Sequence, residues 1–149
     1  MWAVAFGGSH REETDEMSRK KKVLIAVGVV VIVLILAGVG GFVWITSGLS
    51  KYKNMTIGKV DPTKLPDGTY KGSFKGGRWS NTVEVTVRSH KITSIKVVKD
   101  VEFKNPKVAN QVFNEVKSAQ STQVDAVTGS TVTSKAYLKS IENALTGKQ

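Results

Sequence analysis

Five hydroxyl side chains lie within seven residues near the C-terminal end of the chain, in the stretch DAVTGSTVTS at positions 125–134. Such a cluster can serve two kinds of chemistry. In an ordinary turn rich in serine and threonine, one hydroxyl caps the helix that follows. Alternatively, one hydroxyl is a covalent attachment point. Gly129 lies between Thr128 and Ser130, so the backbone can come close to a bulky group, and the free N–H groups at a helix start favour a phosphate.

The elements around this cluster must position it, and the strands come first in the chain. From Asp67, DGTYKGSFKG and then NTVEVTVR alternate apolar and polar residues, which predicts half-buried strands. Ser89-His90 is predicted as a hairpin tip, and KITSIKVVKD as the returning strand. The alternation slips between Ile92 and Ile95, so a bulge is expected there.

Helices follow the strands. Asn105-Pro106 is a cap followed by a first-turn proline, and it predicts a helix that ends near Ala119. Residues 124–127 are predicted as a short extended piece, and KAYLKSIENAL at 135–145 as an amphipathic helix. The order of elements predicts an α+β domain, in which a small antiparallel β-meander packs against two helices.

An uncharged run of 23 residues, Val23–Ile45, precedes this domain. As a helix it would be about 35 Å long, which is enough to cross a membrane. A cleaved signal peptide is the alternative, but its apolar region should be only about 7–15 residues long. Five cations precede the run within about 15 residues and three follow it. We therefore expect a cytoplasmic N-terminus and a single-pass anchor in the cell membrane, with the domain extracytoplasmic.

The resulting division has four parts. Residues 1–22 are a cytoplasmic basic flank, 23–45 the transmembrane helix, 46–66 a flexible linker, and 67–147 the extracytoplasmic domain. Residues 1–16 show no helix or strand period, so translation is predicted to start at Met17. The net charge is +10. The lysines are scattered along the domain, which indicates a solvated surface facing an anionic membrane or wall polymer and not a nucleic-acid partner.

With these elements in place, the hydroxyl stretch resembles the flavinylation motif of the FMN-binding domain family. This family includes subunits of the sodium-pumping NADH:quinone reductase and extracytoplasmic flavoproteins. The motif positions are Asp125, Thr128, Gly129, Ser130, Thr131 and Thr133. The resemblance extends upstream to LPDGTYKGSFKGGRWSNTVEVTV, so it covers residues from about 65 to 146. Ser130 stands where the family more often has alanine.

The resemblance implies that a flavin transferase moves FMN from FAD onto Thr131 as a phosphoester. Asp125 would then be a recognition residue for the transferase, and Thr128 or Thr133 would help to shape the turn. Trp79 and Tyr70 are either core aromatics or stacking partners for the flavin ring, and residues 76–78 either pass near the flavin or form a simple loop. No metal site is expected.

Function follows from the same resemblance. We expect a membrane-anchored carrier that passes electrons from a membrane donor to an extracytoplasmic acceptor, and not a self-contained enzyme. The alternative is a non-redox module whose basic surface binds cell-wall polymer or anionic lipid.

Overall fold

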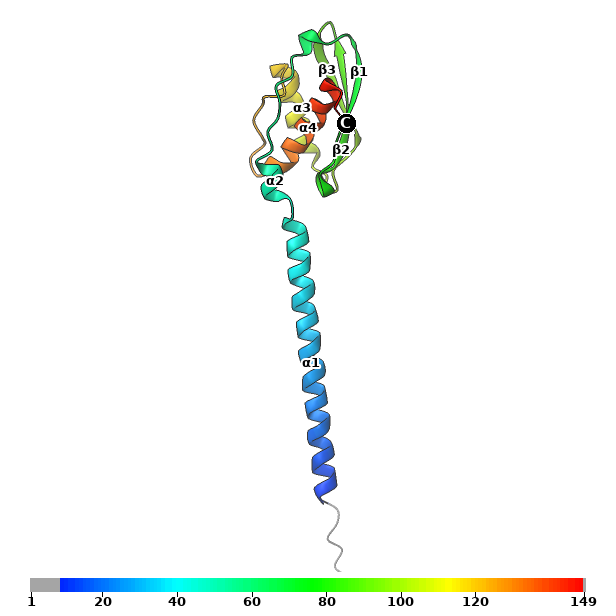
Figure 1. Ribbon diagram of the computed structural model, residues 1–149, viewed down its shortest axis with the longest axis vertical. Coiled ribbons are helices and arrows are strands. Elements are labelled where there is room, and N and C mark those ends of the chain that lie inside the picture. The colour runs from blue at the N-terminus through cyan, green and yellow to red at the C-terminus, as the bar shows by residue number, and fades with distance from the viewer. Residues whose placement is uncertain (1–8, 149) are drawn as a thin grey trace, which may run out of the picture. The chain divides into compact units, whose positions relative to one another are not determined.

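A computed structural model describes the backbone of residues 9–148 and the side chains of residues 18–148. The chain divides after Ser47 into two units, Met1–Ser47 and Gly48–Gln149. The first unit contains helix α1 (Ser9–Thr46) and the second holds every other element (Figure 1). Each unit is considered by itself below.

Helix α1 contains the predicted membrane span. Its most apolar window has a mean hydropathy of 3.2, and among the described residues it alone is long and apolar enough to cross a membrane. The apolar helix of a signal sequence has the same properties. The large apolar side chains of α1 are exposed, for example Leu24 by 70% and Trp44 by 59%. Such exposure would be unfavourable in water. The helix begins well before Val23. The prediction for residues 1–16 thus missed a helix from Ser9, and residues 1–8 lie outside the described part.

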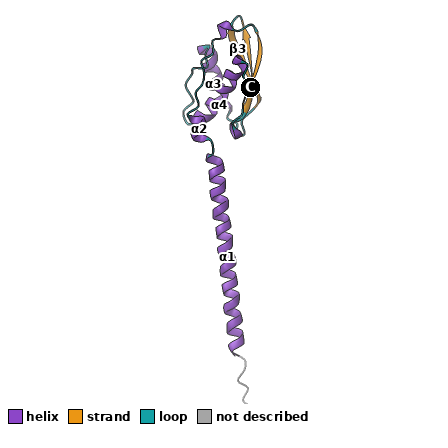
Figure 2. Ribbon diagram, in the orientation of Figure 1, coloured by secondary structure: helices purple, strands orange, loops and turns teal. Residues whose placement is uncertain are grey.

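The second unit is built on a three-stranded antiparallel sheet in the order β1-β2-β3. The strands are β1 (Gly68–Phe74), β2 (Asn81–Arg88) and β3 (Lys91–Lys99), as Figure 2 shows. In β2, Val83, Val85 and Val87 are fully buried while the residues between them are partly exposed. The predicted alternation therefore places one face of the sheet in the core.

The sheet also confirms the predicted bulge. Thr86 pairs with Ser94 and Val87 with Ile92, so β3 has one extra residue between the two pairs. This slip lets Ile92 face the core despite the broken alternation in the sequence, since it is only 3% exposed. The α+β class and the meander are thus confirmed.

The hairpin tip between β2 and β3 is held by a carboxylate from outside the hairpin. Ser89 and His90 have positive φ values of 51° and 59°, which L-residues adopt at some cost. Their backbone N–H groups donate to Asp67 at 2.9 Å and 3.3 Å. These two hydrogen bonds, from Ser89 first, are the main reason that the pKa of Asp67 is lowered.

Helices α3 (Pro106–Ala119) and α4 (Thr131–Thr146) cover one face of the sheet (Figure 2). Asn105 caps α3 as predicted, because its side chain accepts from the Val108 N–H. The predicted stripes of both helices are buried: Val108, Ala109, Val112, Phe113, Val116, Tyr137, Leu138, Ile141, Ala144 and Leu145. The short strand predicted at 124–127 does not form, and these residues run as a loop.

Helix α4 approaches β1 very closely at one glycine. A Cβ atom at Gly72 would lie 2.2 Å from the Ala144 backbone nitrogen and 2.3 Å from the Ser140 carbonyl oxygen. Only a residue without a side chain allows the helix to reach this depth. Gly72 therefore fixes the distance between the sheet and the helix that begins at the hydroxyl cluster.

Most of the segment predicted as a flexible linker, residues 48–66, is instead part of the folded unit. It includes the short helices α2 (Leu49–Lys53) and η1 (Pro62–Lys64). We call residues 53–60 the strap. The Lys135 ammonium donates to the carbonyls of Lys53 and Met55 at 2.7 Å and 3.0 Å, and the Gln123 amide donates to the Ile57 carbonyl at 2.6 Å.

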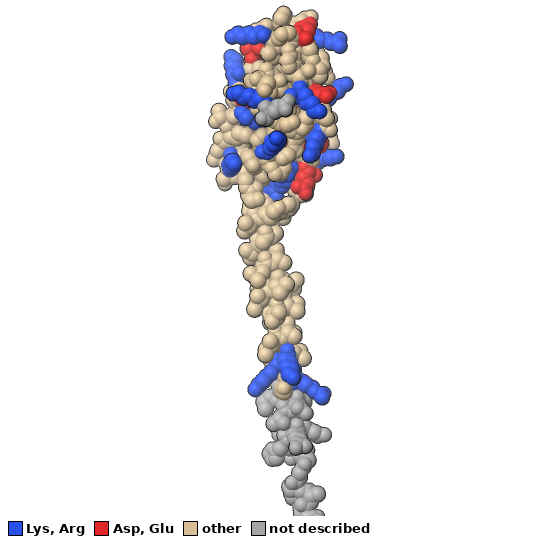
Figure 3. All heavy atoms as spheres, turned by 45° about the vertical axis from the view of Figure 1, so that its right-hand side comes forward, with Lys and Arg blue, Asp and Glu red and all other residues tan. Residues whose placement is uncertain are grey.

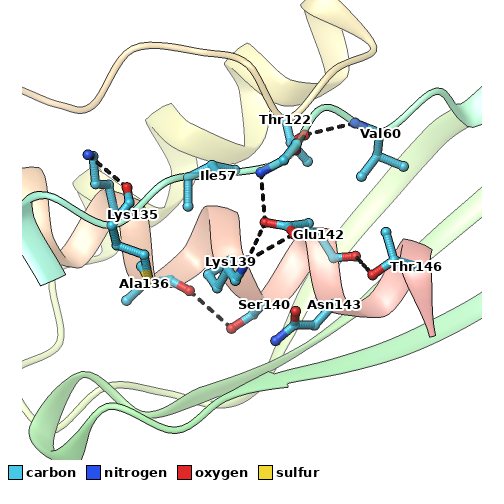
Figure 4. Close-up of polar contacts among 12 residues, drawn as sticks. Ile57, Val60, Thr122, Lys135, Ala136, Lys139, Ser140, Glu142, Asn143 and Thr146 are labelled. Atoms are coloured by element: carbon cyan, nitrogen blue, oxygen red, sulfur yellow. Dashed lines mark hydrogen bonds and ion pairs between the residues drawn. The ribbon is translucent and has the colours of Figure 1, made fainter. Parts of the chain in front are cut away.

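The other end of the strap is bound in the same way (Figure 4). The Gly58 N–H donates to the Glu142 carboxylate at 2.9 Å, and Lys139 pairs with the same carboxylate at 2.8 Å. Thr122 donates to the Gly58 carbonyl at 2.6 Å and accepts from the Val60 N–H at 3.2 Å. Val60 is only 7% exposed. The linker prediction was wrong here because side chains far along the sequence bind the backbone of this segment.

Basic side chains are spread over the folded unit. After residue 50 the chain has 17 Lys and Arg against 8 Asp and Glu. On the face that Figure 3 shows, the lysines and arginines are scattered among neutral residues and are not gathered into one patch. Dispersed charge of this kind keeps a surface solvated and attracts anionic surfaces at long range.

Candidate functional site

The hydroxyl cluster begins with a tight turn. The Ser130 N–H donates to the Val127 carbonyl at 2.9 Å, which closes a turn over Thr128 and Gly129. Gly129 has a φ of 77°, and no atom lies within 4 Å of where its Cβ would be. The glycine is therefore required for its backbone conformation, and it leaves open space beside the turn.

A buried serine behind the turn holds it in place. Ser134 is fully buried, and its hydroxyl accepts from the Val127 N–H at 3.0 Å and donates to the Ser130 carbonyl at 2.9 Å. Among the described hydrogen bonds, none involves the side chain of Thr128 or Thr133, which were predicted to shape the turn. Sequence reasoning missed Ser134. The available signal was its position one turn before Leu138 on the buried stripe, where a hydroxyl must find partners.

Thr131 is the first residue of α4 and is partly buried. The N-cap residue Ser130 makes no hydrogen bond to the helix through its side chain. The first hydrogen bond of the helix runs from the Ser134 N–H to the Ser130 carbonyl at 2.9 Å. The Thr131 hydroxyl thus lies at the positive end of the helix, where a negative group attached to it is favoured.

Asp125 lies between two hollows at the surface. One, of about 420 Å³, is lined by residues 54–57 of the strap, by residues 122–125 and by Lys135. The other, of about 410 Å³, is lined by residues 123–125 and by the end of α3. Both volumes are within the usual range of about 300–1,000 Å³ for small-molecule sites. Asp125 is exposed at the wall of both, so a partner can reach it from either side.

A small aromatic cluster lies beneath the first turns of α4. Trp79 and Phe74 are buried there with Val132 and Ala136, and Tyr52 of α2 packs edge-on against both aromatic rings. Trp79 is thus a core aromatic, and it packs under the helix that begins in the motif. Tyr70 packs against the main core instead, and its hydroxyl donates to the Pro66 carbonyl at 2.7 Å.

Residues 77–79 form the short helix η2, which places Arg78 over this cluster. Its guanidinium lies 4.2 Å from the centroid of the Trp79 ring. One guanidinium nitrogen, Nη1, is buried and has no hydrogen-bond partner among the described residues. A buried donor without a partner is costly, and an acceptor from outside the chain would satisfy it.

Residues 77–146 match the model of the family described as "FMN-binding domain". The resemblance to the FMN-binding domain family is confirmed. The match includes β2, β3, α3, α4 and the whole motif from Asp125 to Thr133. The strap and β1 lie outside it, although they pack into the same unit as the FMN-binding domain.

A comparison with curated proteins shows a partial likeness. An uncharacterized protein of Treponema pallidum (strain Nichols) is 30% identical over 89 residues, which cover 58% of this chain and 25% of that protein. The chain therefore spans about a quarter of the length of this relative. The likeness concerns a single region and carries no activity for the whole protein.

The residues of the site fit FMN as a cofactor. Gly129 leaves open space beside the turn, and the Thr131 hydroxyl stands at the positive end of α4. Lys135 uses two of its three N–H donors on the strap. Arg78 has a buried nitrogen without a partner. These donors suit a phosphate and the acceptor atoms of a flavin. With the apolar helix α1, the FMN-binding domain fits a membrane-anchored FMN-binding protein.

Proposed function

We propose that this chain is an extracytoplasmic electron carrier that holds FMN covalently on Thr131 through a phosphoester. The observation that carries the proposal is the position of Thr131. It occupies the acceptor position of the motif and is the first residue of α4, next to a turn that a buried serine holds rigid. When bound, the isoalloxazine ring supplies one- and two-electron chemistry.

The attachment reaction requires a flavin transferase and uses FAD as the donor of FMN. The Thr131 hydroxyl oxygen forms a new bond to the phosphorus of the FMN half, the pyrophosphate bond of FAD breaks, and AMP leaves. The hydroxyl proton goes to a base of the transferase. On this chain, Ser134 and Gly129 keep the turn in one shape, and the positive end of α4 stabilises the charge of the diester.

Two features support the location and the role. The basic residues directly before the apolar run of α1 favour an N-terminus in the cytoplasm, with the folded unit outside. Outside the cell, a cofactor that dissociates would be lost by dilution, whereas an ester bond retains it. Electrons would come from a donor in the membrane and pass to an extracytoplasmic acceptor.

Thr131→Ala should abolish the covalent flavin and leave the fold intact. The Thr131 hydroxyl has no hydrogen bond among the described contacts, so its loss should change the free energy of unfolding by only about 0.5 kcal/mol. The full chain is co-expressed with a flavin transferase. In-gel flavin fluorescence after denaturation, and the mass of the tryptic peptide 118–135, then measure loading.

Thr133→Ala is the matched control, because it removes a hydroxyl two residues away from the acceptor and should retain the flavin. Loss of the FMN mass in Thr133→Ala together with its retention in Thr131→Ala would place the ester on Thr133. If the wild-type protein is colourless after co-expression with an active transferase, the proposed role as a flavin electron carrier is wrong. That result would favour the non-redox module that binds anionic polymer or lipid through its basic surface.

A further inference from the structure

Lys135 lies one helical turn after Thr131. Residues four apart lie on the same face of a helix, with about 5–6 Å between their Cβ atoms, and their side chains interact. Side chains in a helix also lean toward its N-terminus, so the stem of Lys135 extends toward the turn that contains Thr131. A negative group on Thr131 would therefore have Lys135 as its nearest cation along α4.

The Lys135 ammonium is already committed to the strap. It donates to the carbonyls of Lys53 and Met55, and Figure 4 shows it extending from α4 to that segment. The first carbonyl belongs to the last residue of α2, and the second lies just beyond the C-cap residue Asn54. An ammonium has three N–H donors, so one remains for another acceptor. Lys135 also lines the 420 Å³ hollow, so its side chain borders open space.

We propose that Lys135 binds the phosphate carried on Thr131 while it keeps its hold on the carbonyls of Lys53 and Met55, so that loading of Thr131 tightens the strap. This inference rests on the proposed function, because it requires a phosphate at Thr131. Lys135 acts as a positioning residue, since it holds the ester at one end and the strap at the other.

The number of N–H donors on the Lys135 ammonium decides whether binding of a phosphate tightens the strap or releases it. A cation with only two donors would have to leave one carbonyl to reach a phosphate, and the strap would loosen. The third donor of Lys135 removes this competition. The phosphate also restricts the long and flexible lysine side chain, so part of the entropy cost of holding the strap is already met in the loaded protein. Loading and strap closure then favour one another.

Hydrogen exchange of the strap amides measures the effect. The Gly58 and Val60 amides are bonded to Glu142 and Thr122, so their exchange requires the strap to open. The full chain in detergent is compared with and without FMN on Thr131, by mass spectrometry of peptides that contain these residues. Loading should slow their exchange about two- to tenfold, as expected for a helix ion pair up to a charge-assisted hydrogen bond.

Two variants of Lys135 separate this role from a merely structural one. Lys135→Gln keeps a donor for the strap but removes the charge, so exchange should become equal in loaded and unloaded protein. Lys135→Arg should restore the difference. Lys139→Met is the matched control on the same face, because it weakens the strap only through Glu142. It should speed exchange in both states and preserve their ratio.

A pair of variants without flavin tests the same contact independently of the transferase. Thr131→Glu places a carboxylate one turn before Lys135, and Thr131→Gln differs from it only in charge. The glutamate variant should exchange its strap amides about twofold more slowly than the glutamine variant. If wild-type protein gains no FMN mass, the proposed function fails, and this pair still decides the role of Lys135. Three results would overturn the inference. The strap amides could exchange at equal rates in Thr131→Glu and Thr131→Gln, or they could exchange faster in the loaded wild-type protein than in the unloaded one. Loading could also slow their exchange as much in Lys135→Gln as in the wild type.

Discussion

Gly72→Ala should strongly destabilise the folded unit, because α4 leaves no room for a methyl group on β1. The new carbon would lie 2.2 Å from the Ala144 nitrogen and 2.6 Å from the Ala144 Cα atom. Both neighbours are backbone, so no side chain can rotate away. Ordinary contact needs roughly 3.4 Å or more, and the helix would have to move by about 1 Å from the strand. That movement would disturb the packing of Tyr137 and Ile141, which are fully buried.

The magnitude follows from these contacts. Inserting a methyl group into a packed core costs about 1–3 kcal/mol, and backbone on both sides places this site at the upper end. Replacing glycine returns about 0.4–1 kcal/mol through the unfolded chain, which leaves a net loss of about 2 kcal/mol. For a domain of this size the melting temperature should fall by about 10 °C.

The assay is thermal unfolding of the full chain in detergent, followed by near-ultraviolet circular dichroism of the buried aromatic residues. Gly68→Ala is the matched control on the same strand. Its Cβ would meet nothing closer than 3.9 Å, so its melting temperature should stay within about 2 °C of the wild type. Equal melting temperatures for the two variants would show that α4 does not approach β1 at Gly72 as described.

Two further predictions concern the turns. The pKa of Asp67 is lowered from 3.8 in the folded state, so its carboxylate contributes stability above this value and loses the contribution as pH falls through the folded pKa. Asp67→Asn should therefore be less stable than wild type near pH 7, and the difference should shrink below about pH 4 in unfolding curves recorded across this range. Ser134→Ala should cost about 1–3 kcal/mol in urea unfolding, since it leaves the Val127 N–H without its partner. Ser134→Ala should also lower flavin loading, whereas Thr133→Ala should change neither the stability nor the loading. Unchanged loading in Ser134→Ala would show that the turn does not need this hydroxyl.

The elements with a clear period could be predicted from the sequence alone. The alternation of β2 and the cap at Asn105 report local physics, and the structure follows them closely. Even the slip between Ile92 and Ile95 was informative, because one bulge accounts for it. The turn over Thr128 and Gly129 could also be predicted, since its glycine and hydroxyls are adjacent in the chain.

The strap could not be predicted in this way. Its bonds join backbone groups of residues 53–60 to side chains of residues 122–142, and such contacts leave no period in the segment itself. A mixture of Gly, Ser and Lys looks like a solvated coil unless the partners are known. For Ser134 the buried stripe of α4 predicts only that its hydroxyl needs partners; the partner Val127 N–H is brought to it by the turn.

The strap also sets the order in which the chain can fold. The strap is made near the start of the unit, yet Thr122, Lys135 and Glu142 are made only when most of the unit has been synthesised. Gly58 and Glu142 are separated by 84 positions, and the Gly58 amide cannot be satisfied by this carboxylate before the last helix emerges. Contacts of such long sequence separation form late and slowly. The nascent unit should therefore stay open until nearly all of it has been synthesised, and during that time the hydroxyl of Thr131 lies in a loose chain without its helix.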